Sequence, residues 1–374
     1  MNLYLNGRYY ELCRACILYR PTVTGTVLAG GPSSSLFTLP AEMITDAAGN
    51  IYIIDQRATH DVVLKVTPDG VVTTFAGGAN EFGRLMGMGL DAVRGLLYVA
   101  DATSQQVKAI NFSAPATITI LAGSGTAGNA DGTGAAASFR FGAQLVSNFG
   151  SSETGQGLVV DAAGNVIVGD NSPDAPFASQ LRKITPAGVV TTVAGSVIRP
   201  TNQAEAASPS GIAVNAANDL LYVGGSSGFF QGITKITSTG TASRLAGHIT
   251  FEGLHDGLGA IAQFSYPKAI HYQFPYYYVA DGTNGALRRV SADGNVITLA
   301  GVGHFLTPTF CSCPDAGPVS GSYVMPWLGL TTDTYELLAR NIKMNQAGGV
   351  AAVNGGLIYV ADYGYKCIWK ITIR

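Results

Sequence analysis

The chain has 374 residues, of which 12% are charged and 47% are hydrophobic, so it is long enough to bury a large core. Its 22 basic and 24 acidic residues give a formal net charge of −2. The basic excess typical of nucleic-acid binders is absent, and no apolar run reaches the roughly 18 residues of a membrane span, so neither a nucleic-acid partner nor membrane insertion is expected.

The first 21 residues, 1–21, form a leader without the apolar core of a secretory signal. This leader contains a Cys-x-x-Cys pair, Cys13 and Cys16. The repeats described next begin after it, so a single folded domain is expected over residues 22–374.

Two short phrases each recur six times along residues 22–374. The first is a β-rich run that ends in Ala-Gly, at Gly30, Gly77, Gly123, Gly195, Gly247 and Gly301. The second is "IYIID" at 51–55, which returns in related form at 97–101, 166–170, 221–225, 277–281 and 358–362. Together with the apolar runs around them, they define four short strands per unit, named a to d in chain order. Four antiparallel strands repeated at this spacing are typical of a propeller blade.

The two ends of the repeat region complement each other. The chain stops at a c strand (366–374) with no d strand after it, and residues 22–30 form a d strand with no a, b or c before it. We therefore predict an all-β fold, a six-bladed β-propeller of four-stranded antiparallel blades, whose last blade is completed by residues 22–30. Closing the ring in this way hides sheet edges that would otherwise invite aggregation.

The stretch "DAAGNIYIIDQRATHDVVLKVTPDGVVTTFAGG" (46–78) resembles an NHL repeat, and the resemblance covers nearly all of residues 22–374. The phrase Asp-Gly-x-Gly-Ala-x-Ala-x-Phe, at 131–139 and 256–264, is similar to connectors between NHL blades. The resemblance implies a six-bladed propeller that serves as a platform for proteins or RNA. A minority of six-bladed relatives are enzymes, so the family does not fix the function.

The long connectors all belong to one face of the expected propeller. The a–b and c–d turns are short and share one face, whereas the b–c and d–a loops share the other, here called the working face. Its long connectors are 123–139, 247–264 and 302–349, with b–c loops at 171–180 and 225–232. Function tends to lie on variable loops held by a rigid scaffold. The candidate binding residues are aromatic side chains of the shorter loops, Phe177, Phe229, Phe230, Tyr363 and Tyr365, which could instead fold back onto neighbouring loops.

The expected inner strands are almost free of ionisable groups, with Glu42, Lys268 and His271 as the exceptions. A divalent-metal site needs several carboxylate or histidine ligands, so no catalytic residue, metal or cofactor is expected. The recurring aspartates at the ends of the b strands are expected to cap loops rather than bind ligands. They are Asp55, Asp101, Asp170, Asp281 and Asp362, with Gly225 in the remaining blade. Asp131 and Asp256 are expected to make tight Asp-Gly turns.

The cysteines and one sequon bear on the compartment. Ring closure brings Cys13 and Cys16 to the same blade as Cys311 and Cys313, so two disulfides are predicted, with a zinc site or free thiols as alternatives. Asn111-Phe112-Ser113 is a glycosylation sequon, and Asn111 is the predicted acceptor. Both features favour an extracellular or cell-surface protein; the alternative is a cytoplasmic one.

These observations favour a non-catalytic binding or structural module whose partner is a protein, including a further copy of the chain in a self-assembly. One alternative is a divalent-metal hydrolase or lyase with its site in the central channel. Another is RNA binding by the working face, which would require a basic patch there.

Overall fold

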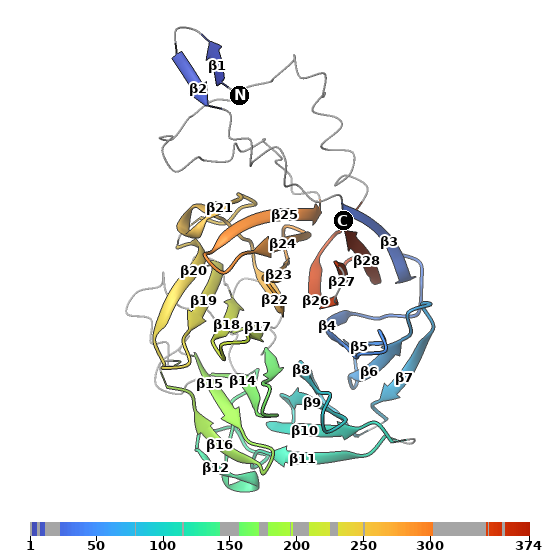
Figure 1. Ribbon diagram of the computed structural model, residues 1–374. Coiled ribbons are helices and arrows are strands. Elements are labelled where there is room, and N and C mark those ends of the chain that lie inside the picture. The colour runs from blue at the N-terminus through green and yellow to red at the C-terminus, as the bar shows by residue number, and fades with distance from the viewer. Residues whose placement is uncertain are drawn as a thin grey trace.

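The computed structural model describes residues 2–5, 8–11, 23–78, 80–113, 116–142, 157–171, 179–194, 196, 209–224, 231–249, 251–301, 342, 344–353 and 356–374. Most of the strands in these ranges form six antiparallel sheets arranged as blades around a central axis (Figure 1). The protein is therefore an all-β six-bladed propeller, as the repeats predict.

Each blade runs from an inner a strand to an outer d strand, and the blades follow one another in chain order. The strands are β4 (Pro40–Thr45), β5 (Ile51–Asp55), β6 (Val62–Val66) and β7 (Val72–Ala76) in blade 1; β8 (Leu85–Asp91), β9 (Leu96–Asp101), β10 (Gln106–Asn111) and β11 (Ile118–Ala122) in blade 2; β13 (Leu158–Val160), β14 (Val166–Asn171), β15 (Ser179–Ile184) and β16 (Val189–Thr192) in blade 3; β17 (Gly211–Val214), β18 (Leu220–Gly224), β19 (Gln231–Ile236) and β20 (Ala242–His248) in blade 4; β22 (Pro267–Gln273), β23 (Tyr276–Asp281), β24 (Ala286–Val290) and β25 (Asn295–Gly301) in blade 5; and β26 (Ala347–Val353), β27 (Leu357–Asp362) and β28 (Cys367–Ile373) in blade 6.

The ring is closed by β3 (Val23–Gly30), the d strand of blade 6. It pairs antiparallel with β28, from Cys367 opposite Gly30 to Ile373 opposite Val23. The prediction that residues 22–30 complete the last blade is confirmed.

The hydrophobic core lies between neighbouring blades. Every residue of the b strand β5 is buried, because both faces of the sheet are covered by other blades. At the interface of blades 2 and 3, Val107 and Ala109 of β10 pack in one cluster with Val166 and Val168 of β14. This packing explains why the b strands have nearly continuous apolar sequences instead of alternating ones.

Short turns join strands a and b, as the sequence predicts. The Asp46 N–H donates to the Asn50 carbonyl, and the Asp46 carboxylate accepts the Asn50 N–H at 2.9 Å. Asp161 and Asn165 repeat this arrangement in blade 3. The turn residues therefore close their own loops and leave little variable surface on this side of the ring.

Three features were not anticipated. Blades 3 and 5 have a fifth strand, because β12 (Gly132–Thr133) pairs with β16 and β21 (Gly257–Leu258) pairs with β25. Each is followed by a single 3-10 turn, η1 (Gly134–Ala136) or η3 (Gly259–Ile261). The expected leader contains an antiparallel hairpin of β1 (Asn2–Leu5) and β2 (Arg8–Glu11). Finally, β26 begins at Ala347, inside the range expected for the connector 302–349.

Among the described residues, no helix has the length and apolar character needed to cross a membrane.

Candidate functional site

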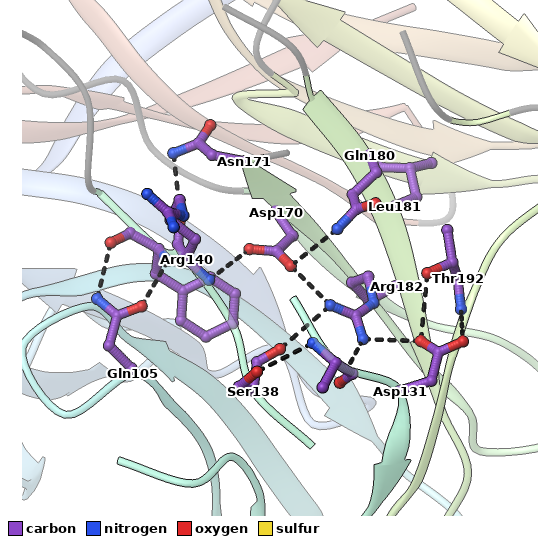
Figure 2. A network of polar contacts seen from close by, with 12 residues as sticks. Gln105, Asp131, Ser138, Arg140, Asp170, Asn171, Gln180, Leu181, Arg182 and Thr192 are labelled. Atoms are coloured by element: carbon purple, nitrogen blue, oxygen red, sulfur yellow. Dashed lines mark hydrogen bonds and ion pairs between the residues drawn. The ribbon is translucent and has the colours of Figure 1, made fainter. Parts of the chain in front are cut away.

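A buried arginine organises the connector of blade 3 (Figure 2). Arg182 of β15 is fully buried, and its Nη1 atom lies 2.9 Å from Oδ2 of Asp170. Its Nη2 atom lies 2.8 Å from Oδ1 of Asp131, and the guanidinium also donates to the Ser138 and Ala130 carbonyls. One cation therefore joins the c strand, the end of the b strand and the d–a connector.

The same carboxylates hold further parts of the connector. Asp131 accepts the Thr192 hydroxyl at 3.2 Å, and Asp170 accepts the Arg140 N–H at 2.7 Å. The Arg182 guanidinium lies 5.4 Å from the centre of the Phe139 ring, within cation–π range. Phe139 is fully buried between blades 2 and 3, so the ion-pair network fixes an apolar side chain in the core.

Blade 5 contains the same arrangement. Arg288 lies 2.6 Å from Asp281 and 3.0 Å from Asp256, and its guanidinium is 4.9 Å from the Phe264 ring centre. Asp256 accepts the Thr298 hydroxyl at 2.8 Å. The phrase at 131–139 and 256–264 is thus repeated because each copy holds a buried arginine. The expectation that Asp131 and Asp256 make tight Asp-Gly turns is wrong, because the glycine after each aspartate begins a short strand, β12 or β21. The two carboxylates instead form ion pairs across the blade.

The aspartates at the ends of the b strands have a structural role in every blade that carries one. Asp55 pairs with Arg57 at 3.0 Å, Asp101 with Lys108 at 2.7 Å, and Asp362 accepts the Trp369 Nε1–H at 3.3 Å. Burial alone would raise the pKa of Asp101, but Lys108 and backbone N–H donors lower it below its usual value. In blade 4, the residue at the position of these aspartates is Gly224, which pairs with Gly232 of the c strand. It lies one residue before Gly225, the residue that the repeat predicts there. The prediction that these aspartates cap the loop that follows is confirmed for Asp101 and Asp362, which accept backbone N–H groups from that loop. The backbone N–H groups described for Asp55, Asp170 and Asp281 belong instead to the connector before the blade.

Each of these carboxylates also receives a backbone N–H from the connector that leads into its own blade, and a large apolar residue precedes the donor. These residues are Phe37, Phe82, Phe139, Phe264 and Met344, before the donors Thr38, Gly83, Arg140, Ser265 and Asn345. All five are buried. Sequence reasoning missed them as a set, although Phe37, Phe82 and Phe264 each stand three residues before the a strand of their blade, as Met344 does in blade 6.

The inner strands hold the three ionisable groups that the sequence singles out. Burial raises the pKa of Glu42, on β4, to about 8. Burial lowers the pKa of His271, on β22, to about 4, although a hydrogen bond to the Ala352 backbone acts to raise it. Burial also lowers the pKa of Lys268, at the bulge of β22. The structure therefore favours neutral Glu42 and His271 near neutral pH.

The inner strands pack closely against each other. A Cβ atom on Gly211 of β17 would lie 2.7 Å from the Ala269 Cα of β22, and one on Gly349 of β26 would lie 2.3 Å from the Ala41 carbonyl oxygen. Among the described residues, no group of three or more histidine, cysteine, aspartate or glutamate side chains could hold a metal ion. Neither Glu42 nor His271 therefore belongs to such a group among the described residues.

A groove of about 330 Å³ opens on the working-face side of blade 6. Its lining is mainly apolar and includes Val27, Pro32, Tyr365 and Trp369. Of the five candidate binding residues, Tyr365 thus lines a concave surface. Tyr363 is half-buried and turned toward Gly348 of β26, where a Cβ atom would lie 3.1 Å from its ring. Phe177, Phe229 and Phe230 lie outside the described residues.

Only some of the residues in the cysteine and sequon predictions lie in the part of the chain that the structure describes. Cys13, Cys16, Cys311 and Cys313 lie outside the residues whose side chains are described. Cys367 is a buried free thiol, and burial raises its pKa to about 12, so it carries little of the reactive thiolate near neutral pH. The Asn111 Oδ1 atom accepts the Ser113 hydroxyl at 2.6 Å, on the c–d turn of blade 2.

No protein-family model and no curated protein matches this sequence. Among solved structures, it is similar to a protein of unknown function from Bacteroides thetaiotaomicron, with 16% identity over 95% of this chain and 77% of that one and a TM-score of 0.62. It is also similar to an auxiliary nutrient binding protein from the same organism, with 12% identity over 95% of this chain and 77% of that one and a TM-score of 0.61. A gluconolactonase from Xanthomonas campestris has 12% identity over 95% of this chain and 95% of its own, with a TM-score of 0.53. At these identities the likeness shows the six-bladed propeller fold alone.

Proposed function

We propose that this protein is a non-catalytic, NHL-type propeller that binds a protein partner through its working face, in an extracellular or cell-surface assembly. The observation that carries the proposal is the groove of blade 6, in which Tyr365 and Trp369 are set beside Val27 and Pro32. Aromatic side chains in a pocket are typical anchors of protein interfaces.

The positions of the acidic groups also support a binding role. The carboxylates repeated in the blades are occupied by Arg, Lys, Trp or backbone donors, as described above. They hold connectors in place and so stabilise the loops that a partner would contact. A rigid scaffold of this kind lowers the entropy lost when a partner binds.

Site-specific photo-crosslinking in the native source tests the proposal. A benzophenone amino acid replaces Tyr365 on the working face or, as the control, Val93 on the opposite face, where the side chain is 89% exposed. The expected result is a protein adduct at position 365 and none at 93. Adducts at 93 alone, or at neither position, would count against a working-face platform.

The alternative is a divalent-metal hydrolase or lyase, and one observation favours it. Glu42 lies on an inner strand, and burial raises its pKa to about 8, close enough to neutral pH for a general acid. His271, on another inner strand, is kept neutral by a pKa of about 4, and a neutral imidazole is the form that binds a metal ion. A thermal-shift titration with Ca²⁺, Mg²⁺ or Zn²⁺ distinguishes the metal-dependent enzyme from the non-catalytic binding module. Stabilisation of the natural protein that is lost in Glu42→Gln would favour a metal-dependent site. The same stabilisation in both proteins would assign the ions to other positions.

A further inference from the structure

Lys268 stands outside the regular ladder of its inner strand, β22. The register with β23 shifts between Pro267 and Ala269, so Lys268 is the extra residue of a β-bulge. A bulge changes the direction of the side chain that it carries, and bulges are over-represented next to active sites. Of the three ionisable groups that the sequence singles out on the inner strands, Lys268 is the one to which the proposed functions give no role.

The Lys268 side chain lies at the working-face end of β22, beside blade 6. A Cβ atom on Gly282, the first residue of the b–c loop, would lie 2.9 Å from the Lys268 Cγ atom and 3.5 Å from the Ala347 carbonyl oxygen of β26. The stem of the lysine is thus packed against backbone where blades 5 and 6 meet. Lys268 is half-buried, so its side chain keeps contact with solvent and a small molecule can reach it.

Lys268 differs from other half-buried lysines of the propeller in having no carboxylate partner. The Nζ atom of Lys108 lies 2.7 Å from Asp101, and that of Lys235 lies 2.7 Å from Asp219. A carboxylate at this distance favours the charged form of a lysine. In the described part of the chain, no ion pair or hydrogen bond holds the Lys268 amine, and burial lowers its pKa with no charged neighbour acting against the shift.

The acids at the same end of blades 5 and 6 already have partners. Asp281, opposite Pro267, is paired with Arg288, and Asp362, opposite Ala347, accepts backbone N–H groups. Both carboxylates are fully buried. An amine that is partly removed from water and has no counter-ion favours its neutral form, which is the nucleophilic one.

We propose that Lys268 is a nucleophilic amine through which the protein captures a small aldehyde or ketone as an imine. The lone pair of Nζ attacks the carbonyl carbon, and the carbonyl oxygen takes both protons of the amine and leaves as water. The step therefore needs no oxidant or reductant. Lysines that form Schiff bases are typically desolvated in this way. The inference does not depend on the protein partner proposed for the groove at Tyr365.

Reductive labelling of the full natural chain with acetaldehyde and sodium cyanoborohydride at pH 7 tests the proposal. The aldehyde is limiting, and peptide mass spectrometry measures the rate at which each lysine is alkylated. The exposed Lys366 and the ion-paired Lys108 serve as controls within the same molecule. The reaction is repeated on the chain unfolded in guanidinium chloride and on the variant Lys268→Met.

The expected result is that Lys268 of the folded protein reacts about tenfold or more faster than Lys366, because each unit by which a lysine pKa falls raises the neutral fraction about tenfold near pH 7. The two lysines should react at equal rates in the unfolded chain, and Lys268→Met should lack the fast phase. Labelling of Lys268 that is no faster than that of Lys366 in the folded protein would overturn the proposal. So would a rise in melting temperature with inorganic phosphate that Lys268→Met lacks, because the amine would then bind an anion in its charged form. Either outcome leaves the Tyr365 adduct as a separate test of the proposed function.

Discussion

The Nη1 atom of Arg288 lies 2.6 Å from Oδ2 of Asp281, and both side chains are fully buried. Removing two charges from water costs free energy that only a well-formed set of hydrogen bonds can offset. Arg288 has that set, because it also donates to Asp256 and to the Gln263 and His255 carbonyls. The pair therefore stabilises the connector only as long as both partners are present.

Arg288→Met is expected to lower the free energy of unfolding by about 3–5 kcal/mol, because it leaves Asp281 buried without its cation. Urea denaturation measures the loss. The matched control is Arg289→Met on the same strand, whose side chain is half-buried over the Tyr276 ring at 4.3 Å and whose loss should be much smaller. Equal losses in the two variants would contradict a special role for the buried pair.

Phe264 provides a second test, because blade 6 has Met344 at the equivalent position. Phe264→Met should cost less than about 1.5 kcal/mol, as volume-conserving core changes do. Phe264→Ala should cost about 3–5 kcal/mol through the cavity it leaves. Thermal and urea unfolding of both variants give the values. If the methionine variant is as unstable as the alanine one, the position requires an aromatic ring under Arg288.

Glu42 gives the protein a pH dependence on the alkaline side. Its pKa is raised to about 8, so the folded state holds a proton that the unfolded chain releases near pH 4. The stability that the protonated Glu42 side chain contributes is complete below about pH 4 and is lost as the pH rises toward 8. Glu42→Gln should therefore melt like the natural protein at pH 4.5 and at a higher temperature at pH 8.5. A difference that does not change with pH would show that Glu42 titrates normally.

His271 acts in the opposite direction. Burial lowers its pKa to about 4, so the unfolded chain takes up a proton near pH 6.5 that the folded protein does not bind. Its contribution is complete above about pH 6.5 and is lost as the pH falls toward 4. The melting temperature of His271→Gln should thus depend less on pH between 6.5 and 4 than that of the natural protein. An unchanged acid profile in the variant would assign the acid sensitivity to other groups.

The architecture could be predicted because each blade repeats the same short-range information. Turn residues such as Asp46 and Asn50 close their own loops, and the apolar runs specify strands buried on both faces. The arginine networks were missed because Arg182 and Asp131 are far apart in sequence, and nothing local reveals that they meet. The groove at Tyr365 was missed for a similar reason, because it is formed by strands from opposite ends of the repeat region. Self-association and compartment are properties of surfaces, which the blade pattern does not specify.

The pairing of β3 with β28 also sets the order in which the molecule can be completed during translation. The strand that closes the ring is the first blade strand to leave the ribosome, and its partner is the last. Until Cys367–Ile373 has been synthesised, the hydrogen-bonding edge of β3 and the apolar side of blade 1 that faces β28 have no cover. A shortened chain, or one stalled before that strand, would therefore expose sites that invite wrong pairings.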